Sequence, residues 1–336
     1  MRIMRSSALL AAVLIAAGRA NADGPAPEQP WFPTECATSA AAILARLNAL
    51  RCGTQVHYYE AEAGAWTHRR TTWLDAVAYH PSLCDGAQKH ARYLLLNCDP
   101  GKGEHDERPG LAGFSEEGKK AATSGILSVQ QSDHALANAI LSGQCEYRHR
   151  LYLLSPDLGL VGLGLESDAG MGGFGKSVFV LNFDIYYPSL KQTLKTSFLR
   201  VVNYPPDGTS DACRAYLPEN PQIEGEEEFG LPVTVQFFGP APEGCSGRLW
   251  EVRAKGDKLL EVPVLLSAPG AVLGAGSHYD TIALLPRQTL KEDTRYKYQV
   301  AATVGGRPFQ FEAAFATGKR LLPFAKSKRL GGGRGR

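Results

Sequence analysis

Two histidines lie in sequence contexts that could support metal chemistry. His105 lies in a charged segment together with Glu104, Asp106 and Glu107, and His149 lies between two arginines. Two neutral imidazoles and a carboxylate can bind Zn²⁺ and leave one coordination position open for water or substrate. A single histidine is more often a solvated or structural residue, so a joint role depends on the elements that position the two.

A glycine-rich segment at residues 170–177 matches a phosphate-binding pattern. It reads Gly-Met-Gly-Gly-Phe-Gly-Lys-Ser, which satisfies both G-x-x-x-x-G-K-[ST] and G-x-G-x-x-G. Both patterns need a helix after the glycines, because the helix N-terminus helps to bind the phosphate. Residues 178–183 are rich in Val and Phe and predict a strand instead. We therefore interpret the segment as a hairpin turn and expect no nucleotide site.

The first part of the chain combines helices with a closing β-hairpin. Ile43, Leu47 and Leu50 fall on one helical face, and Pro81 occupies a favoured position at the start of a helix. His90 falls on the apolar face of this second helix, so we expect it to be a core residue and not a metal ligand. The predicted elements are helices over 38–51, 80–97 and 132–142, an irregular loop over 99–118, and strands over 158–165 and 178–185. This order indicates an α+β unit.

The pattern changes near Leu199, where short β-type runs separated by Pro, Gly and Asp begin. The predicted strands are 200–204, 232–238, 248–253, 258–266, 279–285, 296–304 and 308–317. Seven strands without an intervening helical stretch indicate an antiparallel sandwich.

Six short motifs follow one another along the first part of the chain. They are Leu47–Arg51, Ala87–Leu94, His105, Ser142–Arg150, Val161–Gly164 and Phe179–Phe183. In this order and spacing they resemble the CAP superfamily, the fold of cysteine-rich secretory proteins, and are most similar to its bacterial SCP-like members. The resemblance covers roughly residues 38–187. It implies an α-β-α sandwich in which His105 and His149 are the two cavity histidines.

The resemblance fails at the carboxylates of that cavity. Family members with an intact cavity place a Glu between the two histidines, where this chain has Ser124, and a second family Glu has no counterpart within 136–142. Glu107, Asp106 or Glu104 could supply a substitute, whereas two imidazoles alone bind Zn²⁺ weakly. Ser124 lacks a G-x-S-x-G context and an oriented Asp, so we assign no catalytic residue.

The second part is similar to bacterial Ig-like or fibronectin-III-like modules. Its residues 294–304, a Gly-Gly-Arg turn and residues 309–317 are similar to the last two strands of such modules. The predicted fold class is therefore α+β: a CAP-like α-β-α sandwich followed by an all-β Ig-like sandwich. The predicted ranges are a signal peptide (1–22), a Pro-rich lead-in (23–37), the CAP-like domain (38–187), a linker (188–198), the Ig-like domain (199–318) and a basic flexible tail (319–336).

The N-terminus predicts export. Arg2 and Arg5 precede the ten-residue apolar run 8–17, and Ala20-Asn21-Ala22 supplies a small-x-small cleavage pattern with a mature start at Asp23. Ten apolar residues are too few to span a bilayer core of about 30 Å. We expect a secreted or periplasmic protein without a transmembrane segment.

All seven cysteines follow the predicted cleavage site, in a compartment where disulfides form. Cys84 and Cys98 would lie about 21 Å apart along one helix, too far for a disulfide. Cys213 and Cys245 are alone in the C-terminal half and form the natural pair. The connectivity of the remaining cysteines stays open; these are Cys36, Cys52, Cys84, Cys98 and Cys145.

The charge is unevenly distributed. The chain carries a net charge of +2, but its first 22 residues hold three arginines and residues 319–336 hold seven Lys or Arg, so residues 23–318 carry −8. An acidic body excludes a duplex-DNA binder, which needs basic residues on a folded face. We expect the basic tail to contact an anionic envelope polymer.

These observations predict a secreted, non-enzymatic binding protein with a degenerate His/Glu cavity. Its ligand would be an extracellular peptide, lipid or protein. One alternative is a metal-dependent hydrolase that uses His105 and His149 with a loop carboxylate, and another is a structural component of the envelope. We expect no resident cofactor in the binding protein, whereas the hydrolase would use Zn²⁺.

Overall fold

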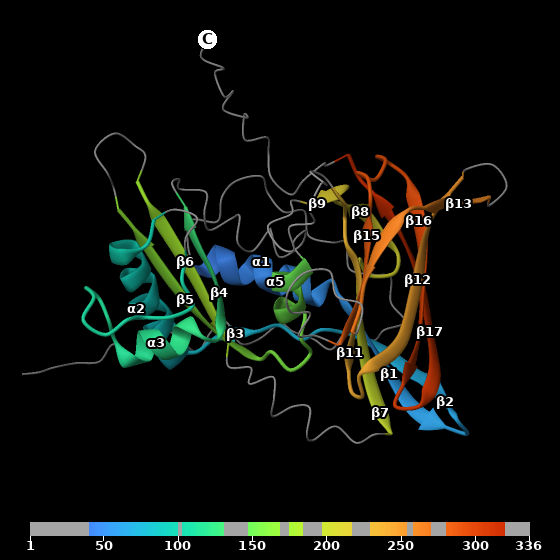
Figure 1. Ribbon diagram of the computed structural model, residues 1–336, viewed down its shortest axis with the longest axis horizontal. Helices are drawn as coiled ribbons and strands as arrows, with labels where there is room; N and C mark the ends of the chain where they lie inside the picture. The colour runs from blue at the N-terminus through green and yellow to red at the C-terminus, as the bar shows by residue number, and fades with distance from the viewer. Residues whose placement is uncertain are drawn as a thin grey trace, which may run out of the picture.

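The computed structural model describes residues 40–99, 103–130, 147–168, 175–183, 197–216, 229–253, 258–269 and 280–319. The predicted signal peptide, the lead-in, the helix over 132–142, most of the glycine-rich turn, Cys36, Cys145 and the tail beyond residue 319 lie outside these ranges. The described residues form a mixed α+β structure in which strands predominate (Figure 1).

The structure contains the helices predicted over 38–51 and 80–97 and most of the predicted strands, but it divides the predicted strand 258–266 into two. It also has helices or strands within 55–79, 116–130, 147–153, 209–216 and 229–230 that the sequence analysis did not identify. The helices are α1 (Ala40–Cys52), α2 (Pro81–Asn97), α3 (Glu116–Ala122) and α5 (Tyr147–Leu153). The strands of the first part are β1 (Gln55–Glu62), β2 (Ala65–Trp73), β3 (Ala78–Tyr79), β4 (Gly125–Gln130), β5 (Leu160–Ser167) and β6 (Ser177–Phe183). The later strands are β7 (Phe198–Tyr204), β8 (Thr209–Ala212), β9 (Ala215–Tyr216), β10 (Phe229–Gly230), β11 (Val233–Phe238), β12 (Pro242–Val252), β13 (Leu259–Val262), β14 (Val264–Ser267), β15 (Thr281–Pro286), β16 (Arg295–Val304) and β17 (Arg307–Thr317).

A four-stranded sheet with the order β3-β5-β6-β4 separates two layers of helices. Successive side chains of a strand point to opposite faces, so Val178 and Val180 pack under α2 while Phe179 and Leu181 pack on the side of α1. Figure 1 shows α2 and α3 on the outer face, and α1 and α5 between this sheet and the rest of the molecule.

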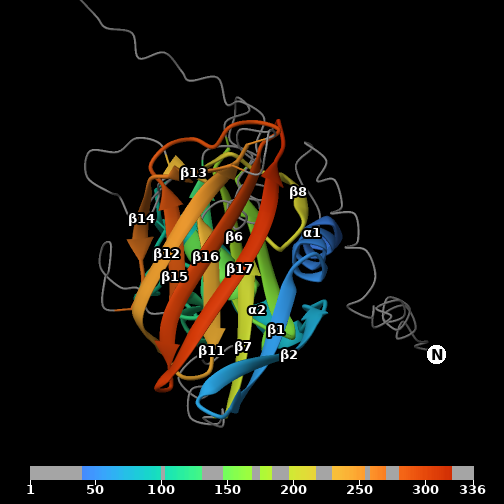
Figure 2. The ribbon, with the colours of Figure 1, turned by 90° about the vertical axis from the view of Figure 1, so that its right-hand side faces the viewer.

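The C-terminal strands form two facing sheets. One has the order β14-β15-β11-β7-β1-β2 and the other β13-β12-β16-β17-β8 (Figure 2). Buried and exposed residues alternate along β16 and most of β17, which places one side of each strand between the sheets. Leu249, Tyr298 and Phe315 fill this interior from one sheet, and Val201 and Ile282 fill it from the other.

The β1–β2 hairpin differs from the predicted assignment of residues 38–187 to one unit. The sequence analysis identified no strands there, yet β1 pairs with β2 along its length and with β7 from Val56↔Val202 to Glu60↔Phe198. The hairpin thereby completes one sheet of the C-terminal sandwich. Hydrogen bonding between strands, and not position along the chain, decides to which sheet the hairpin belongs.

Two arginines, one of them fully buried, join the helical layer to the sandwich. Arg150 of α5 is fully buried, donates from Nη2 to the carbonyl oxygen of Pro232 (2.8 Å), and lies 4.1 Å from the ring centre of Tyr204. Arg200 of β7 makes a two-pronged ion pair with Asp157, at 2.8 and 2.7 Å. One hydrophobic cluster also runs from α1 through the four-stranded sheet into the sandwich, so the two parts share a core.

The cysteines correct one prediction. The expected Cys213–Cys245 disulfide is not formed. Cys245 lies in β12 and Cys213 directly follows β8, and these strands are separated by β16 and β17. Three strand spacings of about 4.8 Å exceed the roughly 7 Å that a disulfide can span between Cα atoms. Within the described ranges Cys52, Cys84 and Cys98 form no disulfide either.

No helix within the described ranges combines the length and the apolar composition that crossing a bilayer requires.

Candidate functional site

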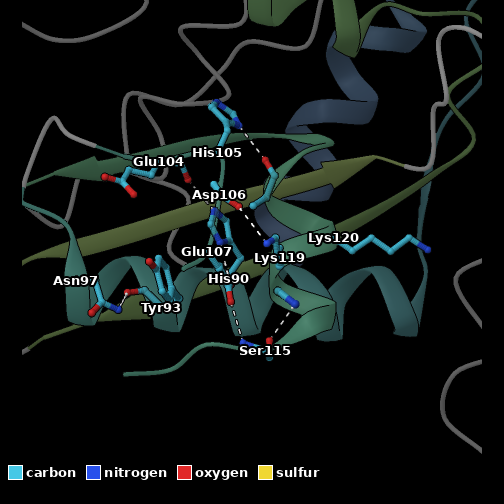
Figure 3. A network of polar contacts seen from close by, with 12 residues as sticks. His90, Tyr93, Asn97, Glu104, His105, Asp106, Glu107, Ser115, Lys119 and Lys120 are labelled. Carbon is cyan, nitrogen blue, oxygen red and sulfur yellow. Dashed lines mark hydrogen bonds and ion pairs between the residues drawn. The ribbon is translucent and has the colours of Figure 1, made fainter. Parts of the chain in front are cut away.

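Four of the predicted cavity residues lie in the loop between α2 and α3: Glu104, His105, Asp106 and Glu107. This loop follows the C-terminal end of α2, passes through residues 103–114 and enters α3 at Ser115. The sequence pattern predicted a loop over 99–118, and the structure begins a helix within that range, at Glu116. Figure 3 shows the polar side chains that this segment brings together.

The centre of the segment is a buried pair formed by His90 and Glu107. Both side chains are fully buried, and His90 Nδ1 lies 3.0 Å from Glu107 Oε1. The second carboxylate oxygen, Oε2, accepts a hydrogen bond from the backbone nitrogen of Ser115 at 2.9 Å. His90 Nε2 donates to the carbonyl oxygen of Glu104 at 3.1 Å. Every polar atom of this pair therefore has a partner.

The hydrogen-bond roles fix how many protons this pair carries. His90 Nε2 must donate because its partner is a carbonyl oxygen, so a single proton is shared between Nδ1 and Glu107 Oε1. Burial lowers the pKa of His90, and the adjacent Glu107 opposes this effect. Burial therefore opposes a full positive charge on the His90 imidazole.

The start of α3 is built around the Glu107 carboxylate. Ser115 is the N-cap, and its Oγ accepts a hydrogen bond from Gly118 N at 2.9 Å. A Cβ atom at Gly118 would overlap both Glu107 Oε1 and Ser115 Oγ, so only glycine permits this close approach. The carboxylate thus connects α2 to α3, which is a structural role.

His105 points away from this pair (Figure 3). Its side chain is exposed, and Nδ1 donates to the carbonyl oxygen of Ala122 at 3.0 Å. In the neutral ring this bond leaves the lone pair on Nε2. Histidines that bind metals are commonly oriented by such a bond to a carbonyl oxygen.

The other predicted carboxylates are exposed or paired on the surface. Asp106 is exposed, and its Oδ1 lies 3.9 Å from Lys119 Nζ. The Glu104 carboxylate accepts two hydrogen bonds from Arg108, at 3.0 and 3.2 Å. Both carboxylates lie beside a basic side chain at the surface, and neither is buried beside a histidine.

His149 and Ser124 come from other elements. His149 is a partly buried residue of α5, next to the buried Arg150. Ser124 lies between α3 and β4, and its hydroxyl donates to Asn182 Oδ1 of β6 at 2.9 Å. The Ser124 proton is therefore engaged by an amide oxygen, which does not activate a nucleophile.

The structure brings together a different set of residues from the predicted one. Within the described ranges no three His, Cys, Asp or Glu side chains are grouped so that they could hold one metal ion. Glu107 was predicted as the carboxylate that accompanies His105 and His149, but its oxygens face His90 and Ser115. The sequence pattern placed His90 correctly on the apolar face of its helix. A buried histidine requires a hydrogen-bond partner, and that requirement was the available signal for Glu107.

Neither a protein-family model nor a curated protein matches this chain. The CAP and Ig-like assignments therefore remain predictions that rest on the motifs quoted above.

Proposed function

We propose that this protein is an exported, non-enzymatic binding protein, composed of a CAP-like layer with a degenerate cavity and an Ig-like sandwich. Its partners would be extracellular or envelope peptides, lipids or proteins. The observation that carries the non-enzymatic assignment is the position of Glu107, whose two oxygens are committed to His90 and Ser115 inside the protein. The loop carboxylate that would make the cavity catalytic serves instead to fix the fold.

Two further observations support the CAP-like part of the proposal. Helices lie on both faces of the four-stranded sheet, and β5 carries Gly162 and Gly164 where the backbone of α2 contacts it. The Val161–Gly164 motif thus has a steric reason in this arrangement. The proposed export rests on the N-terminal sequence alone.

A metal-dependent hydrolase is the second candidate, and one observation favours it. His105 is held by the Ala122 carbonyl in the orientation that leaves Nε2 able to bind a metal. The loop carboxylates that remain for such a site are Asp106 and Glu104. A hydrolase of this kind would need one of them to leave its surface cation.

Zinc titration by calorimetry and digestion of a peptide library separate the two candidates. We expect the wild-type protein to bind no stoichiometric zinc and to cleave no peptide. Tight binding that is lost in both His105→Ala and His149→Ala, together with cleavage, would overturn the non-enzymatic proposal. His80→Ala, which changes an exposed histidine at the start of α2, serves as the matched control.

The basic tail supplies the proposed contact with the envelope. Seven Lys or Arg among the last 18 residues would bind an anionic envelope polymer weakly and in a salt-dependent manner. Removal of residues 319–336 should abolish co-sedimentation with such a polymer at low salt. Undiminished binding by the truncated protein would contradict the proposal.

A further inference from the structure

A second group of polar residues lies in the sandwich, at one open side between its two sheets. A surface pocket of about 380 Å³ lies there between β1–β2 and β17. It is lined by Gln55, His57, Tyr59, His68, Thr71, Asp207, Gln310, Phe311 and Glu312. None of these residues was singled out by the sequence analysis, and none belongs to the segment around Glu107.

A directed chain of hydrogen bonds runs from this pocket into the core. Its inner end is the carbonyl oxygen of Pro205, which accepts from Tyr298 Oη and from Asn203 Nδ2, each at 3.1 Å. The amide of Asn203 therefore has a fixed orientation, with Oδ1 accepting from His57 Nε2 at 2.9 Å. His57 Nδ1 is then an acceptor, and Thr71 Oγ1 donates to it at 2.9 Å.

The outer end of the chain is His68, which is exposed. Because the Thr71 proton points to His57, His68 Nε2 must donate to Thr71 Oγ1, at 3.0 Å. The lone pair of a neutral His68 is consequently on Nδ1. The chain holds His57 neutral and orients both imidazole rings that line the pocket.

The floor of the pocket is formed by aromatic rings. His57 contacts Phe311 with ring centres 5.0 Å apart, and Tyr59 contacts His68 with centres 5.2 Å apart, both edge to face. The two histidine rings themselves are 6.0 Å apart. Aromatic faces carry negative electrostatic potential, which attracts cations that lie above them.

The rim of the pocket is acidic and rich in acceptors. Asp207 and Glu312 contribute carboxylates, and none of the nine lining residues is a Lys or Arg. Asp207 Oδ1 accepts a hydrogen bond from Ala314 N at 2.8 Å, which fixes the position of its carboxylate. Glu312 is partly neutralised by Lys297 at 2.6 Å, so Asp207 is the stronger anchor.

One acceptor of the pocket lacks a donor. Gln55 Oε1 is buried and receives no hydrogen bond from the described part of the chain. A buried carbonyl oxygen without a donor is unfavourable, and an N–H group of a ligand would satisfy it. This acceptor, the aromatic floor and the acidic rim all favour the same chemistry, a positively charged group with several N–H donors.

We propose that this pocket binds an organic cation, a guanidinium or primary ammonium group. The cation would lie over the rings of the floor and donate to Asp207 and Gln55. Its source is either a free small molecule or a basic side chain of a polypeptide. The proposal does not depend on the CAP-like cavity, and its failure would leave the non-enzymatic proposal unaffected.

Isothermal titration of the full chain at low salt tests the proposal. The probes are agmatine, as a free guanidinium compound, and a blocked Gly-Arg-Gly peptide. A blocked Gly-citrulline-Gly peptide controls for shape without charge. We expect at least one guanidinium probe to bind, and the citrulline peptide to bind at least tenfold more weakly than the arginine peptide. Tighter binding of agmatine indicates a free small cation, and tighter binding of the arginine peptide indicates a polypeptide side chain.

Variants locate the binding. Asp207→Asn keeps an oxygen for Ala314 N but removes the charge, and we expect it to weaken binding at least tenfold. Glu243→Gln removes the same charge from an exposed residue of β12 outside the pocket lining and should bind as the wild type does. Thermal unfolding of each variant verifies folding. Absence of binding by both guanidinium probes, or equal affinity of wild type and Asp207→Asn, would overturn the proposal.

Discussion

The His90–Glu107 pair shows how two ionisable residues can be buried at small cost. Each heteroatom of the pair faces a partner, and one shared proton satisfies both side chains without a net charge. A neutral pair avoids the desolvation penalty that a separated imidazolium and carboxylate would incur.

This reasoning predicts different outcomes for two substitutions at residue 107. Glu107→Gln can donate from its amide nitrogen to His90 Nδ1 and accept from Ser115 N, so we expect a loss of about 1 kcal/mol or less. Glu107→Leu leaves both partners buried and unsatisfied and should cost about 3 kcal/mol. Urea denaturation measures both values. The exposed Glu117→Gln is the control, and equal losses for the two residue-107 variants would contradict the shared-proton arrangement.

His57 makes stability depend on pH. Burial lowers the pKa of His57 to about 4, and its hydrogen bond with Asn203 opposes this shift. An imidazole in the unfolded chain has a pKa of about 6.5. Between about pH 4 and pH 6.5 the unfolded chain therefore binds a proton at this residue that the folded protein does not bind. Stability should fall as the pH decreases from about 6.5 to 4, by about 3 kcal/mol from this residue.

The matched experiment compares His57→Gln with His68→Gln in urea denaturation from pH 7 to pH 4. His57→Gln removes the titrating imidazole, so the free energy of unfolding of this variant should depend less on pH. The decrease in slope should correspond to at most one bound proton. His68→Gln changes an exposed ring on the same pocket and should retain the wild-type dependence on the buried His57. An unchanged pH dependence in His57→Gln would show that His57 does not titrate as described.

At the scale of elements, the contact between α2 and β5 depends on two glycines. A Cβ atom at Gly162 would overlap the backbone of Leu83 and Cys84, and one at Gly164 would overlap the backbone of Ala87. The helix can therefore lie directly on the strand, where Ala87 and Ala91 present only small side chains. This close approach positions the end of α2, and with it His90.

Gly164→Ala tests this contact. The added methyl group meets backbone atoms that cannot rotate away, so we expect a loss of about 1–3 kcal/mol in the free energy of unfolding. Gly159→Ala, where a Cβ atom meets open space, is the control and should change stability little. Similar stability for both variants in thermal unfolding would mean that the strand and helix move apart without cost.

At the scale of the whole molecule, the shared core predicts cooperative unfolding. The β1–β2 hairpin belongs to a sandwich sheet, and Arg150 of α5 binds the segment that leads into β11. Breaking either part therefore exposes the interior of the other. Domains that share a core of this kind unfold together, whereas independent domains unfold separately.

We expect one thermal transition, with the same midpoint by helical circular dichroism and by tryptophan fluorescence. The first signal reports the helices, and the second includes Trp66 and Trp250 of the sandwich. Arg150→Met should lower both midpoints together, because it leaves the Pro232 carbonyl oxygen buried without its donor. Two separated transitions in the wild-type protein would show that the parts fold independently.

Local patterns in the sequence predicted much of this fold. Apolar periodicity located α1, α2 and the later strands, since a helix or strand buries one face whatever its partner is. The same patterns missed the β1–β2 hairpin. Apart from Val56 and Tyr59 its residues are largely polar or part-exposed, and only the pairing with β7 shows where it belongs.

The candidate site was predicted in part. The loop after α2 was recognised as the carrier of polar chemistry, and the burial of His90 followed from its helical face. Local sequence patterns could not predict the partner of His90 or the orientation of His105. They also could not predict that Cys213 and Cys245 form no disulfide. The pocket around His57 was missed entirely because its residues come from β1, β2 and β17 and from a turn near residue 207.

The sequence by itself determined the helices α1 and α2 and most strands of the sandwich, because those preferences arise from side chains a few positions apart. It also determined an acidic body with a basic C-terminal end. The tertiary structure decided which residues meet: Glu107 with His90, β1 with β7, and His57 with Asn203. Such contacts join residues from 17 to about 150 positions apart, and the packing of whole layers sets them.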